Sequence, residues 1–271
     1  MVLPSSGTIS LLQIMAEFEG LLPAKLSDYY SDAPAAFTAG VPGVPAKGVS
    51  LSVSGLYSKA KPAVDVIAST PGLIGYYDGE SWDAVAKRWN DKSGAGNHVT
   101  ETTGTGIVAS AAGGTNGLMA LAGNTGDGLR FPVGVLPATY TLFHVARYTS
   151  TTATARKRIF DGVDPNWLSG FWEGRTGCAY HNNWMTPTTY LHGNNWVLST
   201  DRNASYRSNK VVRTTAGPGT PSYLRLSLNY GYWGNERSAW ACQCIAIYNR
   251  TLTDAEVVAI ESELWKRYAL T

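Results

Sequence analysis

The strongest constraint on the fold is a succession of short strand-like runs, separated by turns, that starts near Ala63 and continues almost to the C-terminus. The runs YTLFHVARY (residues 140–148) and AWACQCIAIY (residues 239–248) are apolar at nearly every position, as in central strands that are covered on both faces. The run YLRLSLNY alternates instead, and its inward positions would be Leu224, Leu226, Leu228 and Tyr230. This pattern of short strand-like runs predicts an all-β fold with two antiparallel sheets packed as a sandwich.

The last 20 residues no longer show strand-like runs. Their apolar residues have helical spacing, which predicts a single amphipathic helix docked on the edge of the sandwich. Thr253 and Glu256 have the spacing of a capping box, and Leu252 and Val257 can form its hydrophobic staple. The apolar face of this helix continues through Val257, Ile260, Leu264 and Tyr268.

The first 62 residues predict a small irregular or helical docking and oligomerisation segment that ends in a Pro/Gly linker, before a sandwich domain at residues 63–271. A short helix is expected at residues 10–20, and its apolar stripe would be formed by Leu11, Ile14, Met15 and Phe18. The sequences of residues 3–14 and 44–55 resemble each other weakly, although chance similarity in a low-complexity region would also explain this. Each unit is too small to bury its own core, so the segment is expected to pack on trimer mates or on a larger particle.

The composition favours an extracellular or virion protein and disfavours nucleic-acid-binding and membrane-spanning proteins. The 271 residues include 29 Gly, 15 Tyr and 9 Trp but only 15% charged residues, a balance typical of extracellular or virion β proteins. A net charge of +2 gives no bulk attraction to nucleic acid, and the densest basic stretch, residues 155–158, is interpreted as an exposed loop before a strand. No apolar run approaches the ~18 residues of a membrane span.

Cysteine usage and the N-terminal sequence bear on the compartment. Cys178, Cys242 and Cys244 have no metal-binding spacing, and we expect buried free thiols, the last two on one face of a strand. No signal peptide is visible, so the sequence predicts synthesis in a reducing cytoplasm. A virion protein that leaves the cell by lysis would reconcile this with the extracellular composition.

Three segments occur in an order that resembles the concanavalin A-like lectin/glucanase superfamily, in particular its LamG-like and pentraxin-like jelly rolls. They are WNDKSGAGNH (residues 89–98), IFDG (residues 159–162) and IAIYNRTLTDAEVVAIESEL (residues 245–264). The resemblance covers roughly residues 64–271 and implies a jelly-roll sandwich closed by a C-terminal helix. The N-terminal segment is similar to short segments that begin many phage tail proteins.

The loop DKSGAGNH (residues 91–98) has two interpretations. The first is a tight structural connection in which the glycines take positive φ angles, Asp91 and Asn97 bond to the backbone, and Trp89 anchors the core. The alternative is a calcium or glycan contact through Asp91, Asn97 or His98.

No catalytic arrangement is recognised. Glucanases of this superfamily carry an E-x-D-x-x-E strand, whereas the nearest acidic stretch here, residues 78–83, has a different spacing. The sequence also contains no G-x-S-x-G elbow. The chain is therefore predicted not to be an enzyme.

Tryptophan and asparagine are concentrated between residues 160 and 209, a composition that suits carbohydrate binding because rings stack on sugars and amides bond hydroxyls. The same residues could instead fill the core and turns. The candidate ligand residues are Trp172, Trp184, Trp196, His181, Asn182, Asn183, Asn194 and Asn195. No cofactor is certain, but calcium is a further hypothesis, because carboxylates gather here as Asp161, Asp164 and Asp201.

Together these features predict a virion structural protein, an exposed fibre or appendage that binds host-surface glycan. Its other partners would be virion proteins bound through the N-terminal segment, and a homo-trimer is expected. No nucleic-acid partner and no membrane insertion are expected. The alternative is a structural decoration or connector protein of head or tail without a ligand, and a glycan hydrolase is disfavoured by the missing acid pair.

Overall fold

The computed structural model describes residue 13 and residues 65–186, 191–219 and 224–271. The chain divides into two compact units, Met1–Asp65 and Val66–Thr271, and the second is described here. The predicted docking stripe at Leu11, Ile14, Met15 and Phe18 lies outside the described residues. So does the repeated sequence at residues 3–14 and 44–55, apart from residue 13. In the part that is described, no helix has the length and apolar character needed to cross a membrane.

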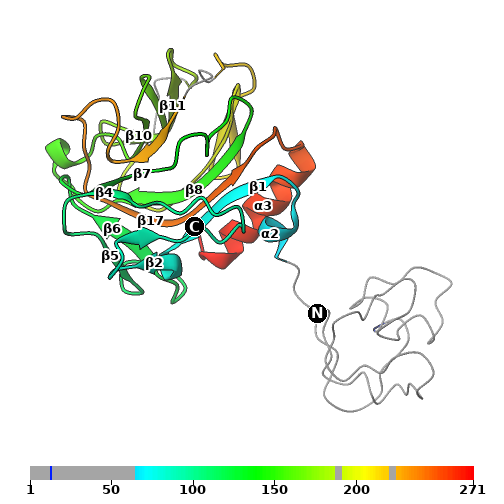
Figure 1. Ribbon diagram of the computed structural model, residues 1–271. Coiled ribbons are helices and arrows are strands. Elements are labelled where there is room, and N and C mark those ends of the chain that lie inside the picture. The colour runs from blue at the N-terminus through cyan, green and yellow to red at the C-terminus, as the bar shows by residue number, and fades with distance from the viewer. Residues whose placement is uncertain (1–12, 14–64, 187–190, 220–223) are drawn as a thin grey trace, which may run out of the picture. The chain divides into compact units, whose positions relative to one another are not determined.

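The second unit is an antiparallel β-sandwich with a C-terminal helix, which confirms the predicted fold class (Figure 1). The larger sheet has the order β15 (Val211–Thr214), β14 (Ser205–Ser208), β13 (Val197–Arg202), β8 (Thr141–Tyr148), β17 (Trp240–Tyr248), β6 (Ala120–Gly123), β5 (Val108–Ser110), and β1 (Leu73–Asp78) also pairs with β17. The smaller sheet has the order β12 (Leu191–His192), β11 (Arg175–His181), β10 (Trp167–Trp172), β9 (Phe160–Gly162), β16 (Leu226–Leu228), β7 (Gly128–Arg130), β4 (Glu101–Thr103).

Short elements complete the unit. A two-stranded hairpin joins β2 (Trp82–Asp83) to β3 (Arg88–Trp89). The remaining helical elements are α2 (Val66–Ser69), α3 (Asp254–Arg267) and the single 3-10 turns η3 (Gly79–Ser81) and η4 (Ala153–Ala155).

The central strands β8 and β17 are buried on both faces, as their nearly continuous apolar sequences predicted. Ile245 and Ile247 of β17 face the main core between the two sheets, whereas Ala246 belongs to a second core on the other side. The pairing of β17 with β8 shifts register between Cys242 and Cys244. This bulge places Cys242 in the main core and Cys244 in the second core, which corrects the prediction that they share a face. All three cysteines are buried.

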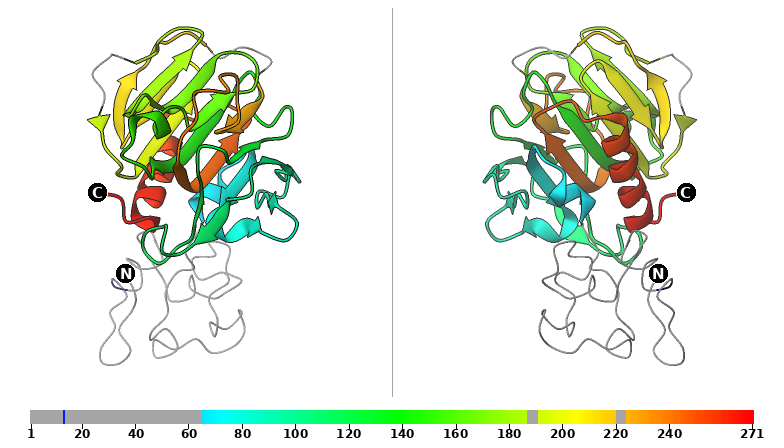
Figure 2. Two further views of the ribbon diagram at one scale, coloured as in Figure 1. Left: turned by 90° about the vertical axis from the view of Figure 1, so that its left-hand side faces the viewer. Right: turned by 90° about the vertical axis from the view of Figure 1, so that its right-hand side faces the viewer.

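Helix α3 covers the outer face of the larger sheet rather than its edge, which corrects the predicted docking position (Figure 2). Its predicted capping box is present, since the Thr253 side chain accepts from the Glu256 N–H and the Glu256 side chain bonds back to the N-cap. The predicted apolar face is buried, and it packs on side chains from β1, β8, β13 and β17. The second core exists because these strands are apolar on both faces, so they need a cover on the side away from the smaller sheet.

The loop at residues 91–98 is a structural connection, as its first interpretation held. The Asp91 carboxylate accepts from the N–H groups of Tyr76 (2.9 Å), Ser93 (2.8 Å) and Asn97 (3.0 Å) and from the Ser93 hydroxyl (2.8 Å). It therefore ties β1 to the loop. Trp89 is fully buried and donates its indole N–H to the Asp78 carbonyl at 2.7 Å.

We predict that Asp91→Ala lowers the free energy of unfolding by about 3 kcal/mol, because it leaves three N–H donors without their charged acceptor. Asp83→Ala is a matched control, since this half-buried carboxylate caps only its own turn through Val85 and Ala86. Urea denaturation of both variants measures the difference. Equal losses in the two variants would contradict the role assigned to Asp91.

Candidate ligand-binding site

Trp172 is positioned by the hairpin that joins β10 to β11. The turn residues Glu173 and Gly174 have φ angles of 52° and 76°, as a tight two-residue turn between twisted strands requires. Because Phe171 points into the main core, its neighbour Trp172 points to the outer face of the smaller sheet. The Arg175 guanidinium, opposite Trp172 in the pairing, lies 5.3 Å from the centre of its ring.

Trp184 returns to the same face directly after β11. Its N–H donates to the Asn183 side chain at 2.9 Å, and the next residue, Met185, bonds to the Ala179 carbonyl at 3.0 Å. The Trp184 ring packs edge-to-face against Trp172, with 4.9 Å between ring centres, and against Tyr180, with 5.3 Å. The three rings thus form one cluster of half-buried side chains.

A third tryptophan, Trp233, comes from the connection between β16 and β17, residues 229–239. Asn229 anchors the start of this loop by donating to the Asp127 carbonyl at 2.7 Å and accepting from the Ser238 N–H at 2.6 Å. The N–H of Tyr232 bonds to the Gly162 carbonyl of β9 at 2.7 Å. The loop therefore folds back over the smaller sheet and presents Trp233, whose exposed fraction is 42%.

Asp161 lies beneath this loop and is buried. Its carboxyl group accepts from the Ser227 hydroxyl, and a Cβ atom at Gly231 would approach it to 2.2 Å, so any other residue there would force the carboxyl group or the loop to shift. Burial raises the pKa of Asp161 to about 7, against the opposing effects of the Ser227 hydroxyl and of Arg158 and Arg237.

The β10–β11 hairpin, the segment directly after β11 and the loop of residues 229–239 surround an open pocket. It has about 530 Å³ of empty space, part of it continuous with solvent. Its lining consists of Trp172, Trp184, Trp233, Tyr180, Leu168, Arg158, Asn166 and Glu236. We call it the aromatic pocket. It holds three tryptophans and one tyrosine from segments far apart in the sequence.

The polar part of the aromatic pocket is a hydrogen-bonded chain. Arg158 donates to the Glu236 carboxylate at 2.5 Å and to the Asn166 side-chain carbonyl at 2.6 Å. The Arg158 side chain is only 5% exposed, so the interpretation of residues 155–158 as an exposed loop is wrong for this arginine. With both groups ionised the pair adds no net charge, and it places donors and acceptors beside the rings.

The predicted ligand residues separate into different regions. Trp172 and Trp184 line the aromatic pocket, and the exposed Asn182 and Asn183 flank Trp184 in sequence. Trp196 packs against the second core beneath the Arg147 guanidinium, 5.0 Å from its ring centre, so it belongs to the opposite side of the sandwich. Asn195 lines a different pocket together with Trp196, and the Asn194 side-chain oxygen is buried without a partner in the described part of the chain.

His181 is corrected from a ligand residue to an interior one. Its Nε2 atom lies 3.0 Å from a carboxylate oxygen of Asp201, whose other oxygen accepts from the Tyr140 hydroxyl at 2.9 Å. All three residues are fully buried, and the bond joins β11 of the smaller sheet to β13 of the larger one. These polar groups satisfy one another inside the sandwich and are not available to a ligand.

The three carboxylates proposed for calcium do not form one site. Asp201 is engaged by His181 and Tyr140, Asp161 lies beneath the residue 229–239 loop, and Asp164 is exposed. Across the described ranges, no group of three or more His, Cys, Asp or Glu side chains could hold a metal ion.

Sequence reasoning missed Trp233, Tyr180, Arg158 and Glu236. The signal was present in the sequence YGYWGNER (residues 230–237), where aromatic residues alternate with glycines outside any apolar run. Its beginning was interpreted as part of a strand, although β16 ends at Leu228. The start of a loop cannot be separated from the end of an alternating strand by periodicity alone.

Comparisons with known proteins identify the fold. No family model and no curated protein sequence matches the chain. Among solved structures, domain 4 of AbnA, a GH43 extracellular arabinanase from Geobacillus stearothermophilus in complex with arabinotriose, matches 70% of this chain and 98% of its own, with 18% identity and a TM-score of 0.51. The binding domain of Paraclostridial Mosquitocidal Protein 1 matches 72% of this chain and 52% of its own, with 13% identity and a TM-score of 0.52. At these identities the matches establish a shared β-sandwich fold.

The prediction that the chain is not an enzyme is corrected by the first match. The fold is shared with a domain of a GH43 arabinanase, so it occurs within an enzyme. The missing E-x-D-x-x-E strand excludes only one arrangement of catalytic acids. The enzyme status of the chain is therefore open.

The buried Asp161 predicts a specific pH dependence of stability. A carboxyl group whose pKa is raised on folding binds its proton more tightly in the folded state, so its contribution to stability is lost as the pH rises from the ordinary 3.8 to about 7. The free energy of unfolding of the parent chain should fall by up to about 4 kcal/mol over this pH range because of Asp161, and this fall should be absent in Asp161→Asn. Urea denaturation between pH 4 and 8 measures it, and parallel curves for the parent and the variant would refute the assignment.

Proposed function

We propose that this domain binds carbohydrate in the aromatic pocket. The observation that carries the proposal is the meeting of Trp172, Trp184 and Trp233 around an ion pair between the buried Arg158 and the half-buried Glu236. Aromatic faces pack against the C–H faces of sugar rings, and a few fixed polar groups then select the hydroxyl pattern.

The polar residues favour uncharged sugar units in this pocket. Arg158 supplies N–H donors and Glu236 supplies carboxylate acceptors, and each is already held by the other. A vicinal pair of hydroxyl groups can bond to both residues without leaving either charge unpaired. The open side of the pocket suits one or two units of a longer glycan, whose remaining units stay in solvent.

The structural matches agree with this proposal by analogy. The arabinanase domain was solved with arabinotriose, and the second match is a toxin's binding domain. A shared fold does not carry a shared ligand, so the argument rests on the pocket itself.

We further propose the biological setting that the composition suggests, an exposed fibre or appendage of a virion. Its LamG-type jelly-roll domain would contact host-surface glycan, and the chain would form a homo-trimer. The low charge and the Gly, Tyr and Trp content support this setting. A decoration protein without a ligand is the competing candidate. A solution mass of the full chain equal to the monomer's 29.0 kDa would argue against the trimer.

We predict that Trp184→Ala and Trp233→Ala each weaken glycan binding about tenfold or more. Loss of one stacking ring costs ~1–3 kcal/mol in related ring-on-ring recognition. Both rings are partly exposed, so the thermal midpoint should change little. A glycan array first identifies the ligand, and calorimetry with that glycan then measures each affinity.

Trp196→Ala is the matched control, because Trp196 is also half-buried but lies on the other side of the sandwich. Its glycan affinity should equal that of the parent chain. If Trp196→Ala weakens binding while Trp184→Ala and Trp233→Ala do not, the ligand binds elsewhere. If the array stays blank for the folded parent chain, the carbohydrate proposal fails.

A further inference from the structure

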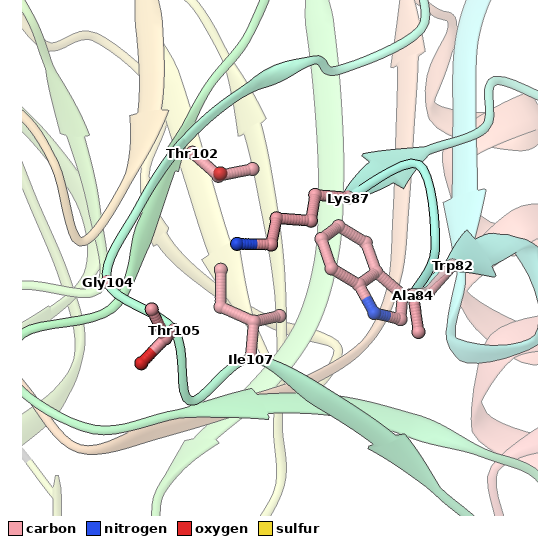
Figure 3. Close-up of a pocket in the computed structure, with 7 residues that line it drawn as sticks. All are labelled: Trp82, Ala84, Lys87, Thr102, Gly104, Thr105 and Ile107. Atoms are coloured by element: carbon pink, nitrogen blue, oxygen red, sulfur yellow. The ribbon is translucent and has the colours of Figure 1, made fainter.

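A second pocket lies between the β2–β3 hairpin and the connection from β4 to β5, at the other end of the domain from the β10–β11 hairpin (Figure 1). It has about 320 Å³ of empty space, part of it continuous with solvent. Figure 3 shows its lining residues, which are Trp82, Ala84, Lys87, Thr102, Gly104, Thr105 and Ile107. None of them contributes to the aromatic pocket.

One wall of this second pocket is apolar and fixed. Trp82 and Ile107 are half-buried and pack against the main core, so both are held in place from behind. Thr102 and Thr105 line the other side of the pocket, beyond the Lys87 ammonium group as seen from Trp82 (Figure 3). Neither hydroxyl bonds to another residue in the described part of the chain.

Lys87 extends across this pocket from an unusual backbone position. Its φ angle is 49°, a left-handed conformation that glycine or asparagine adopts more readily than lysine. The turn is held by Asp83, which accepts from the N–H groups of Val85 and Ala86 at 3.0 and 2.9 Å. Figure 3 shows the Lys87 ammonium group directed into the pocket, on the side of Thr102 and Ile107.

The Lys87 ammonium group is not neutralised by the carboxylates around it. No acidic residue among those described pairs with it. Asp83 is occupied by its turn, Asp127 accepts from the Gly106 N–H at 2.8 Å, and Glu101 is paired with Arg130 and Arg225. The pocket therefore combines an apolar wall, two hydroxyls and one unpaired positive charge.

We propose that this second pocket binds a single acidic sugar unit of the hexuronic acid class. The carboxylate would pair with the Lys87 ammonium, the ring would pack on Trp82 and Ile107, and ring hydroxyls would bond to Thr102 and Thr105. The indole N–H of Trp82 is buried and has no acceptor in the described part of the chain. This site is independent of the aromatic pocket, and either can exist without the other.

The test is an NMR titration of the full chain, with the indole N–H resonance of Trp82 as the reporter. D-Glucuronate and D-glucose are added separately at constant ionic strength, because they share a ring and differ in the carboxylate. Glucuronate should shift the Trp82 resonance to saturation, and glucose should not. Sodium acetate in a third titration provides the charge without the ring and should leave the resonance in place.

Lys87→Asn is the decisive variant, since asparagine suits the left-handed position and lacks the ammonium group. It should weaken glucuronate binding about tenfold or more, the usual effect of losing a charged hydrogen bond. Lys266→Asn on α3 is the control and should bind as the parent does. Trp184→Ala should also leave glucuronate binding unchanged, which separates this test from that of the aromatic pocket.

Three results would overturn the proposal. The first is equal binding of glucose and glucuronate, and the second is an unchanged affinity in Lys87→Asn. The third is an acetate response as large as that of glucuronate, which would reduce the site to nonspecific anion binding.

Discussion

The close approach of Gly231 to the buried carboxyl group of Asp161 fixes the part of the molecule on which the candidate site depends. A side chain at residue 231 would meet that group at 2.2 Å, so either the buried carboxyl group or the loop from Asn229 to Ala239 would have to shift. Without this approach Trp233 and Glu236 would not meet the rings of the β10–β11 hairpin. Strand pairing builds one half of the aromatic pocket. The other half is built by a loop that Asn229, the Tyr232 N–H and the close approach of Gly231 hold over the smaller sheet.

The interior of the sandwich explains why some polar residues that resemble a binding site are not one. Successive strand residues point to opposite faces, so His181 points inward to Asp201 while its neighbour Tyr180 points outward beside Trp184. Placing a polar pair between two sheets is costly unless its partners are satisfied, and here Tyr140 completes the set. One face of β11 thus holds the sheets together, and the other contributes Tyr180 to the aromatic pocket.

Much of the fold could be predicted from the sequence, and much less of the site. Apolar runs located β8 and β17, and the Thr253–Glu256 box located the start of α3, because both signals are local. The face on which α3 docks and the bulge at Cys242 depend on tertiary packing, and both predictions were wrong. Trp172 and Trp184 were identified by composition, but Trp233 joins them from a loop 49 residues beyond Trp184, and Arg158 is held there by Glu236, 78 residues away.

The central claim is that the aromatic pocket is where this domain meets a glycan. The nine tryptophans of the chain give one indole N–H resonance each, so a single NMR titration reports on every candidate surface at once. Adding an uncharged oligosaccharide that the chain binds should shift the resonances of Trp172, Trp184 and Trp233 and leave those of the buried Trp167 and Trp240 in place. Saturable binding that shifts Trp196 or Trp265 instead, with these three unchanged, would contradict the account.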